Sequence, residues 1–201
     1  MESGLIVVGV TGMPGSGKSL VAGEIAAVLS APVYSMGDIV REEVVRRGLP
    51  LNSSNIERVA RILREEMGEA AVAVLLVRRI RESSSRGAIV VDGMRSLAEA
   101  EIISGLGRLC IVAVHASPRT RFERILRRAR RGDAVSWEEF RERDLNNIRL
   151  GIGGLIALAD FMIVNEGGPV EVRAEARRVA RSIAHGEGKG CSGGGYQAYG
   201  E

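Results

Sequence analysis

The sequence predicts a three-layer α/β/α fold built on a five-stranded parallel sheet. Short runs of consecutive apolar residues are typical of strands buried on both faces, and they alternate along the chain with segments of helical apolar spacing. A glycine-rich loop also joins the first apolar run directly to the first helical segment. With 201 residues, of which 45% are hydrophobic, the chain is long enough for one domain with a sizeable core.

The glycine-rich loop reads Gly12-Met13-Pro14-Gly15-Ser16-Gly17-Lys18-Ser19 and has the G-x-x-x-x-G-K-[ST] spacing of the Walker A phosphate-binding loop. Glycines allow the backbone to wrap a polyphosphate with its N–H groups pointing inward. Lys18 would place a positive charge at the β- and γ-phosphates, and the Ser19 hydroxyl would reach a phosphate-bound Mg²⁺. The strand expected at 5–10 and the helix expected after the loop make a chance glycine-rich turn the weaker alternative.

Composition limits the classes of partner. The net charge is only +3 and aromatic residues are 3% of the chain, so a nucleic-acid platform built on base stacking is not expected. No apolar run is long enough to cross a bilayer, and residues 1–4 leave no room for a signal peptide, so we expect a cytoplasmic protein without a membrane partner. Cys110 and Cys191 suggest neither a disulfide nor a metal site. Monomer and homodimer both remain open.

A short second strand is expected at 32–35, followed by Gly37-Asp38 and a helix. This order places Asp38 near the carboxyl edge of the sheet, where open α/β folds bind ligands, and Arg41 lies on the same helical face. Both residues are therefore candidate substrate-binding groups. A helix cap at Asp38 and a solvated Arg41 are the alternative.

A long helical stretch separates the second and third strands. Ser54-x-x-Glu57 has the spacing of a capping box, and a second apolar stripe follows a possible bend at Gly68. Because the stretch is longer than a plain crossover requires, we predict that residues 37–82 form a helical insertion that closes over a second substrate. A long crossover without a binding role is the alternative.

The third strand, expected at 88–93, ends in Asp92, which is the Walker B pattern of an acid that orients Mg²⁺. A simple turn residue is the alternative at this position. Arg95 comes just after the strand end and is a further candidate for binding the substrate. Ser96-x-x-Glu99 then has the spacing of a helix cap.

An arginine-rich helix follows the fourth strand, which is expected at 109–114. In this helix we expect Phe122, Ile125 and Leu126 to face inward. Arginines take most other positions, and their density without interleaved acids indicates an anionic group nearby. They are Arg121, Arg124, Arg127, Arg128, Arg130 and Arg131.

Residues 127–143 are expected to form a small mobile lid in which Arg131 and Arg143 cover a transferring phosphoryl group. Ser136-x-x-Glu139 would cap its second helix, and Trp137 would anchor the turn by packing. A fifth strand is expected at 160–165, with Asn165 at its carboxyl end, where an adenine could rest. The glycine-rich stretch 186–201 is expected to be disordered.

These motifs together resemble the nucleoside monophosphate kinase branch of P-loop proteins, adenylate kinase and dephospho-CoA kinase especially, over residues 5–185. Gly37-Asp38-x-x-Arg41 looks like the segment with which adenylate kinases grip the acceptor nucleotide. Asp92-Gly93-x-Arg95 is similar to their Asp-Gly-x-x-Arg segment but one residue shorter. The segment 159–165 resembles an element of dephospho-CoA kinases. Taken whole, the chain is most similar to an uncharacterised archaeal family of ATP-binding, kinase-like proteins.

The resemblance implies the strand order 2-3-1-4-5, one P-loop kinase-like domain at 1–185, and ATP and Mg²⁺ as cofactors. The leading hypothesis is a kinase that transfers the γ-phosphate of ATP to a nucleoside monophosphate or a dephospho-CoA-like acceptor, with Lys18 and the arginines neutralising charge. A hydroxyl acceptor would need Asp38 as a general base, whereas a phosphate acceptor would leave Asp38 structural. ATP and GTP are not distinguished.

Two other classes remain. The protein could be an ATP-dependent switch or accessory protein, with the arginine-rich face of residues 121–131 as its docking surface. The same face could instead bind nucleic acid, in which case affinity would fall steeply with salt.

Overall fold

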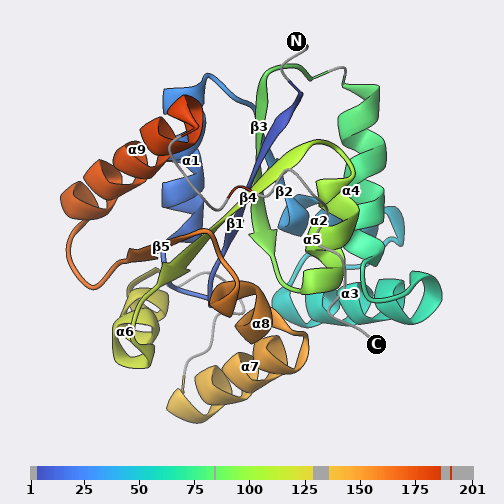
Figure 1. The fold of residues 1–201 in the computed structure, drawn as a ribbon. Coiled ribbons are helices and arrows are strands. Elements are labelled where there is room, and N and C mark those ends of the chain that lie inside the picture. Colours follow the sequence, from blue (N-terminus) through green and yellow to red (C-terminus); the bar gives the residue numbers. More distant parts are fainter. Residues whose placement is uncertain (1–3, 84, 129–135, 187–190, 192–201) are drawn as a thin grey trace.

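The computed structural model describes residues 4–83, 85–128, 136–186 and 191. At its centre is a parallel sheet of five strands in the order β2-β3-β1-β4-β5, which confirms the predicted fold class and strand order (Figure 1). The strands are β1 (Ile6–Thr11), β2 (Val33–Ser35), β3 (Ala88–Met94), β4 (Arg108–His115) and β5 (Phe161–Val164).

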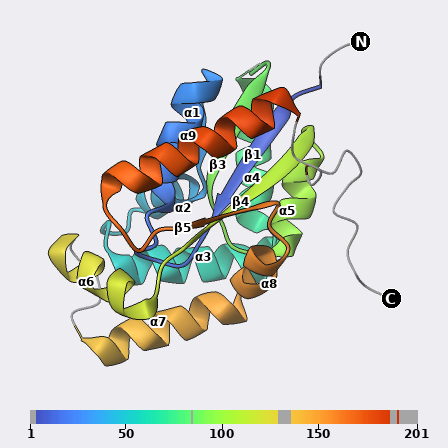
Figure 2. The ribbon, with the colours of Figure 1, turned by 60° about the vertical axis from the view of Figure 1, so that its left-hand side comes forward.

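Helices cover both faces of the sheet and its carboxyl edge. Two of them pack on one face, where Figure 2 shows one lying across the other, and others pack on the opposite face. The first pair is α1 (Lys18–Leu29) and α9 (Pro169–His185). The helices on the opposite face are α2 (Met36–Arg46), α3 (Ser53–Met67), α4 (Ala71–Glu82), α5 (Leu97–Ser104) and α8 (Ile152–Ala157). The remaining two, α6 (Pro118–Arg128) and α7 (Trp137–Arg149), lie near the carboxyl ends of the strands (Figure 1).

The central strand delivers the glycine-rich loop to the carboxyl edge. β1 is buried from Val7 onward, which explains its apolar sequence, and it lies between β3 and β4. At its end the Thr11 hydroxyl donates a 2.8 Å hydrogen bond to the carbonyl of Met94. The loop therefore starts beside the end of β3 and lies close to Asp92 in space.

The helix caps confirm two predictions and correct a third. Ser96 and Ser136 accept hydrogen bonds from the backbone N–H groups of Glu99 and Glu139, as their spacing predicted. Ser54 does not begin α3, because the side chain of Asn52 accepts the cap hydrogen bond, at 2.9 Å from Asn55 N. Asn55 also donates to the carbonyl of Pro50 at 2.8 Å, which ties the preceding turn to the helix.

The inward and outward faces of α6 differ from the prediction. Ile125 is buried as expected, but the Leu126 side chain is exposed, and Arg121 is buried at 3% relative exposure. A charged side chain can occupy this buried position because Arg121 has a carboxylate partner and two carbonyl partners. Arg130 and Arg131 lie outside the described residues.

The two cysteines form a disulfide, so the prediction that they are unpaired is wrong. Cys110 is fully buried on β4 in the core beneath α1 and α9. Cys191 comes a few residues after the end of α9 and packs against that same core. The two residues are 81 positions apart, so only the fold brings them together. Most of the segment predicted to be disordered, residues 187–190 and 192–201, lies outside the described residues.

Within the described residues, the helices are too short or too polar to cross a membrane.

Candidate functional site

The glycine-rich loop has the backbone shape that its sequence predicts. Gly12, Gly15 and Gly17 have φ angles of 150°, 82° and 93°, in the region that favours glycine. A Cβ atom on Gly12 would lie 2.4 Å from the carbonyl oxygen of Val114, and one on Gly17 would lie 2.4 Å from the side-chain nitrogen of Asn165. Glycine is therefore required by close packing as well as by backbone angle. Gly17 is the N-cap of α1, so the start of that helix faces the loop.

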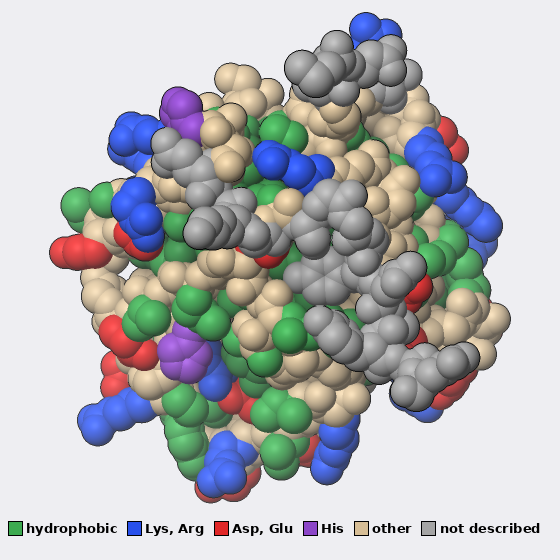
Figure 3. Space-filling view, in the orientation of Figure 1, with side chains coloured by type: hydrophobic (Ala, Val, Ile, Leu, Met, Phe, Trp, Pro, Cys, Tyr) green, Lys and Arg blue, Asp and Glu red, His purple; other side chains and the backbone are tan. Residues whose placement is uncertain are grey.

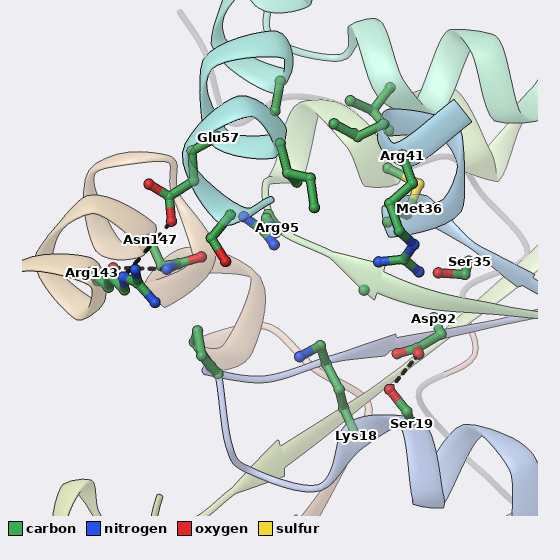
Figure 4. A pocket seen from close by; sticks show the side chains of 18 of the residues that line it. Lys18, Ser19, Ser35, Met36, Arg41, Glu57, Asp92, Arg95, Arg143 and Asn147 are labelled. Atoms are coloured by element: carbon green, nitrogen blue, oxygen red, sulfur yellow. Dashed lines mark hydrogen bonds and ion pairs between the residues drawn. The ribbon is translucent and has the colours of Figure 1, made fainter. Parts of the chain in front are cut away.

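Lys18 is the first residue of α1, and its amine points into a cavity above the loop (Figure 4). Burial lowers the pKa of Lys18 to about 8, with Asp92 acting in the opposite direction and Arg95 lowering the pKa further. A buried ammonium close to several arginines favours an anionic ligand, since the ligand would offset the cost of its burial.

Ser19 and Asp92 meet at the carboxyl edge of the sheet, although 73 residues separate them. The Ser19 hydroxyl donates a 2.7 Å hydrogen bond to Oδ2 of Asp92. The other carboxylate oxygen of Asp92 is buried without a hydrogen-bond partner among the described residues. A hydroxyl and a carboxylate with a free oxygen are ligands that suit Mg²⁺, so these two residues fit the predicted metal site.

One cavity of about 370 Å³ connects the loop to the helical region after β2. Loop residues line one end, and residues of α2 and α3 line the other, with α7 at the side (Figure 4). Three of the predicted site arginines line it together: Arg41, Arg95 and Arg143. The structure thus gathers these residues from α2, the end of β3 and α7 around Lys18.

Arg95 is a partly buried arginine on the cavity wall. Its guanidinium points into the cavity (Figure 4) and makes no hydrogen bond to a described residue, although Glu57 and Glu99 act on it at longer range. Burial lowers the pKa of Arg95 below its usual value. Its backbone N–H is fixed by Glu99, at 2.6 Å, so the side chain is held at the cavity wall.

Glu99 and Arg64 form a buried ion pair behind Arg95. The Glu99 carboxylate, at 1% relative exposure, accepts from Arg64 Nη2 at 3.2 Å. Burial raises the pKa of Glu99, against the opposing effects of these donors. Both residues line the cavity, so its inner wall carries a fixed donor and a fixed acceptor.

Asp38 and Arg143 are not placed as simply as predicted. Asp38 lies in the first turn of α2 and accepts a 3.0 Å hydrogen bond from Nε of Arg41, with about half of its side chain exposed. Of this pair, Arg41 lines the cavity. Arg143 faces Glu57 of α3, with Nε and Oε1 3.8 Å apart, so it bridges α7 and α3 across the cavity. Arg131, the other predicted lid arginine, lies outside the described residues.

A second cavity, of about 500 Å³, lies on the other side of Gly17. Asn165 is at its centre: its amide donates a 2.8 Å hydrogen bond to the carbonyl of Ser16, which fastens the end of β5 to the loop. Arg124 holds this segment through a 2.9 Å bond to the carbonyl of Asn165 and a 3.0 Å bond to the carbonyl of Gly167. Pro169 lines the same cavity.

Several lining residues were not found from the sequence. Arg64 and Asn147 are single polar residues on helices, and no motif marks them; Glu57 was noted only as part of a capping box. Arg128 lines the first cavity and Arg124, one helical turn away, lines the second. From the sequence, all arginines of α6 were grouped on one face, so these two residues were not assigned to different cavities.

The strand–loop–helix order, the loop geometry and the sheet order define a P-loop protein with a nucleotide-binding, kinase-like fold. Two solved structures share this fold. The chain matches a shikimate kinase from Acinetobacter baumannii, solved in complex with shikimate, with a TM-score of 0.60 and 15% identity, covering 91% of this chain and 95% of that one. It matches a gluconokinase from Sinorhizobium meliloti with a TM-score of 0.50 and 21% identity, covering 92% and 95%.

Sequence comparison gives the family. The model of the AAA domain family matches residues 11–141. A UPF0200 protein from Hyperthermus butylicus is 52% identical over 174 residues, which cover 87% of this chain and 92% of the relative. One from Aeropyrum pernix is 50% identical over 177 residues, covering 88% and 92%. The chain belongs to the UPF0200 family of AAA-domain P-loop proteins, in agreement with the archaeal resemblance seen in its sequence.

Proposed function

We propose that the protein is a small-molecule kinase that transfers the γ-phosphate of ATP to a nucleotide-like acceptor. The observation that carries the proposal is the continuity of one cavity from Lys18 to the arginines of the acceptor side. Phosphoryl transfer needs positioning and charge stabilisation rather than a covalent intermediate. A cavity with Lys18 and Arg95 at neighbouring walls is suited to two anionic groups that must approach each other.

The two cavities suggest how the substrates divide. The triphosphate would lie on the loop, with Mg²⁺ held by Ser19 and Asp92; the ion would neutralise phosphate charge when bound. The base of ATP would lie in the second cavity, beside Arg124 and Pro169. The acceptor would occupy the side lined by Arg41 and Arg95, and Arg143 would close over it from α7.

The position of Asp38 bears on the acceptor. Its carboxylate is hydrogen-bonded to Arg41 and about half of its side chain is exposed. This arrangement supports Asp38 as a group that orients Arg41 rather than as a general base. A phosphate group of a nucleoside monophosphate is already a nucleophile and needs no base, so we favour such an acceptor over the hydroxyl of a dephospho-CoA-like molecule.

An acceptor panel tests the proposal. We would supply ATP·Mg²⁺ or GTP·Mg²⁺ with each nucleoside monophosphate and with dephospho-CoA, and measure nucleoside diphosphate formation in a coupled assay. We expect one acceptor to raise turnover and Lys18→Ala to abolish it, because the buried cation at the phosphates is lost. Wild-type turnover in Lys18→Ala, or binding of ATP without transfer to any acceptor, would contradict a kinase of this class.

The structure lends less support to an ATP-dependent switch protein or to a nucleic-acid-binding protein. Arg121 is buried with Asp144, and Arg124 binds backbone carbonyls, so these two α6 arginines are engaged within the protein. On the face shown in Figure 3, the described Lys and Arg side chains are scattered, most of them near the rim, and acidic side chains lie among them. Neither a docking surface for a partner nor a track for nucleic acid is favoured by this distribution.

A further inference from the structure

Arg121 is a buried guanidinium that contacts the phosphate-binding loop. Its side chain is 4% exposed. Nε donates a 3.0 Å hydrogen bond to the carbonyl of Ala116, at the end of β4, and Nη1 donates one of 3.2 Å to the carbonyl of Pro14 in the loop. The loop backbone also packs closely here, since a Cβ atom on Gly15 would lie 2.7 Å from the carbonyl oxygen of Arg121. A shift of the loop therefore has to move Arg121.

The Arg121 guanidinium also contacts α7, through a bidentate ion pair. Nη1 and Nη2 donate to the two carboxylate oxygens of Asp144 at 2.8 and 2.5 Å. This geometry fixes orientation as well as distance. Asp144 lies between Arg143 and Asn147 in sequence, and both of those side chains line the acceptor side of the cavity. The position of Asp144 therefore sets the position of two cavity residues.

Aromatic packing fixes the first turn of α7 to the same region. Trp137 stacks on Phe140 with ring centroids 5.2 Å apart, and Phe122 of α6 packs edge-on against Trp137 at 5.3 Å. The Arg121 guanidinium lies 4.9 Å from the centroid of Phe140. The Arg121–Asp144 pair and the aromatic cluster thus make the loop, α6 and α7 one connected unit.

We propose that Arg121 and Asp144 are positioning residues that couple nucleotide occupancy of the loop to the placement of α7. A phosphate on the loop reorients the Pro14 carbonyl, the change passes through Arg121 to Asp144, and α7 moves Arg143 and Asn147 relative to the acceptor. The inference rests on the proposed nucleotide site, and it adds a role for two residues that are not among the predicted site residues.

The chain offers a direct probe, because Trp137 is its single tryptophan and is the first residue of α7. We would titrate a non-hydrolysable ATP analogue with Mg²⁺ into the full chain, and record tryptophan fluorescence and the heat of binding in parallel. In the wild type we expect a saturable fluorescence change whose midpoint lies at the same analogue concentration as the midpoint of the calorimetric binding curve. In Asp144→Asn we expect that the nucleotide still binds with a measurable heat, whereas the fluorescence change is at least about fivefold smaller than in the wild type.

Matched variants separate coupling from stability. Asp144→Glu restores the carboxylate and should recover part of the response. Glu142→Gln removes an exposed charge from the same helix and should respond like the wild type. If Asp144→Asn fails to fold by circular dichroism, Arg121→Lys takes its place, because it keeps the charge but loses the two-pronged geometry. The same loss of response is expected.

Three results would overturn the proposal. A full fluorescence change in the folded variant, even with a lower melting temperature, would assign the pair to stability alone. Heat of binding in the wild type without a fluorescence change would remove the coupling but leave the nucleotide site in place. Absence of any heat of binding in the wild type would reject the proposed function and the coupling together.

Discussion

Lys18 is the side chain whose protonation state bears most directly on the proposed nucleotide site. Burial lowers its pKa to about 8, so the amine is charged below that pH and loses its proton above it. Phosphates bind the charged form of Lys18. At a pH above the pKa of Lys18 in the free protein, binding therefore requires the amine to take up a proton. Affinity for ATP is therefore expected to be highest below pH 8.

Above pH 8 we predict that the association constant for ATP·Mg²⁺ falls by up to about tenfold per pH unit, until the raised pKa of the complex is reached. Calorimetry between pH 7.5 and 9.5 measures this dependence. Lys18→Arg is the matched control, because an arginine stays charged throughout this range and should show no such fall where it binds. A flat wild-type profile would be inconsistent with the lowered pKa of Lys18.

At the scale of single residues, the sequence predicted site residues that belong to contiguous motifs, but it did not predict contacts between residues far apart in the chain. The loop residues Gly12 to Ser19 were found because their spacing is contiguous, and Asp92 because it ends an apolar run. Arg121 was predicted, with the other arginines of its helix, to lie near an anionic group, and its burial against a carboxylate of the same chain was not predicted. Its partner Asp144 is 23 residues away on another helix, and periodicity cannot show such a pairing.

At the scale of elements, the beginning of α3 is a clear test of local structure. The side chain of Asn52 caps the helix, whereas Ser54 is one position inside it. Asn52→Ala should therefore lower the free energy of unfolding by about 1 kcal/mol, because an orphan N–H loses its partner. Ser54→Ala should change it by less than about 0.5 kcal/mol.

Denaturant unfolding of both variants checks this expectation. If Ser54→Ala lowered the free energy of unfolding more than Asn52→Ala did, Ser54 would be the cap, as the capping-box spacing in the sequence suggested. The strands, by contrast, were all found from apolar runs, with ends shifted by a residue or so. Hydrophobic patterning defines where a buried strand lies, while the choice between neighbouring cap residues depends on a turn geometry that composition does not fix.

At the scale of the whole molecule, the disulfide closes a long loop. Cys110 and Cys191 are 81 residues apart, and the bond joins the central sheet to the chain after α9. Because the bond restricts the unfolded chain, we expect it to raise the free energy of unfolding by about 2–4 kcal/mol. We predict that a reductant lowers the melting temperature of the wild type, and that Cys191→Ser melts at the temperature of the reduced wild type with or without reductant.

Thermal unfolding with and without reductant makes the comparison. Equal melting temperatures of oxidised and reduced wild type would show that the bond contributes nothing to stability. The fold class was predictable from apolar runs that alternate with helical segments, and the strand order followed from the resemblance to P-loop kinases. The disulfide was not, since a contact between residues so far apart follows only from the completed packing of α9 against the sheet.

The central claim is that the first cavity holds the phosphates of a nucleotide at its loop end and the acceptor at its other end, while the second cavity, lined by Gly17, holds the base. A crystal structure with a non-hydrolysable ATP analogue and Mg²⁺ tests it most directly. The account predicts phosphates against the loop amides and Lys18, the metal at Ser19 and Asp92, and the base beside Arg124 and Pro169. A nucleotide bound elsewhere, or a base lying among Arg41, Arg64 and Arg95, would contradict it.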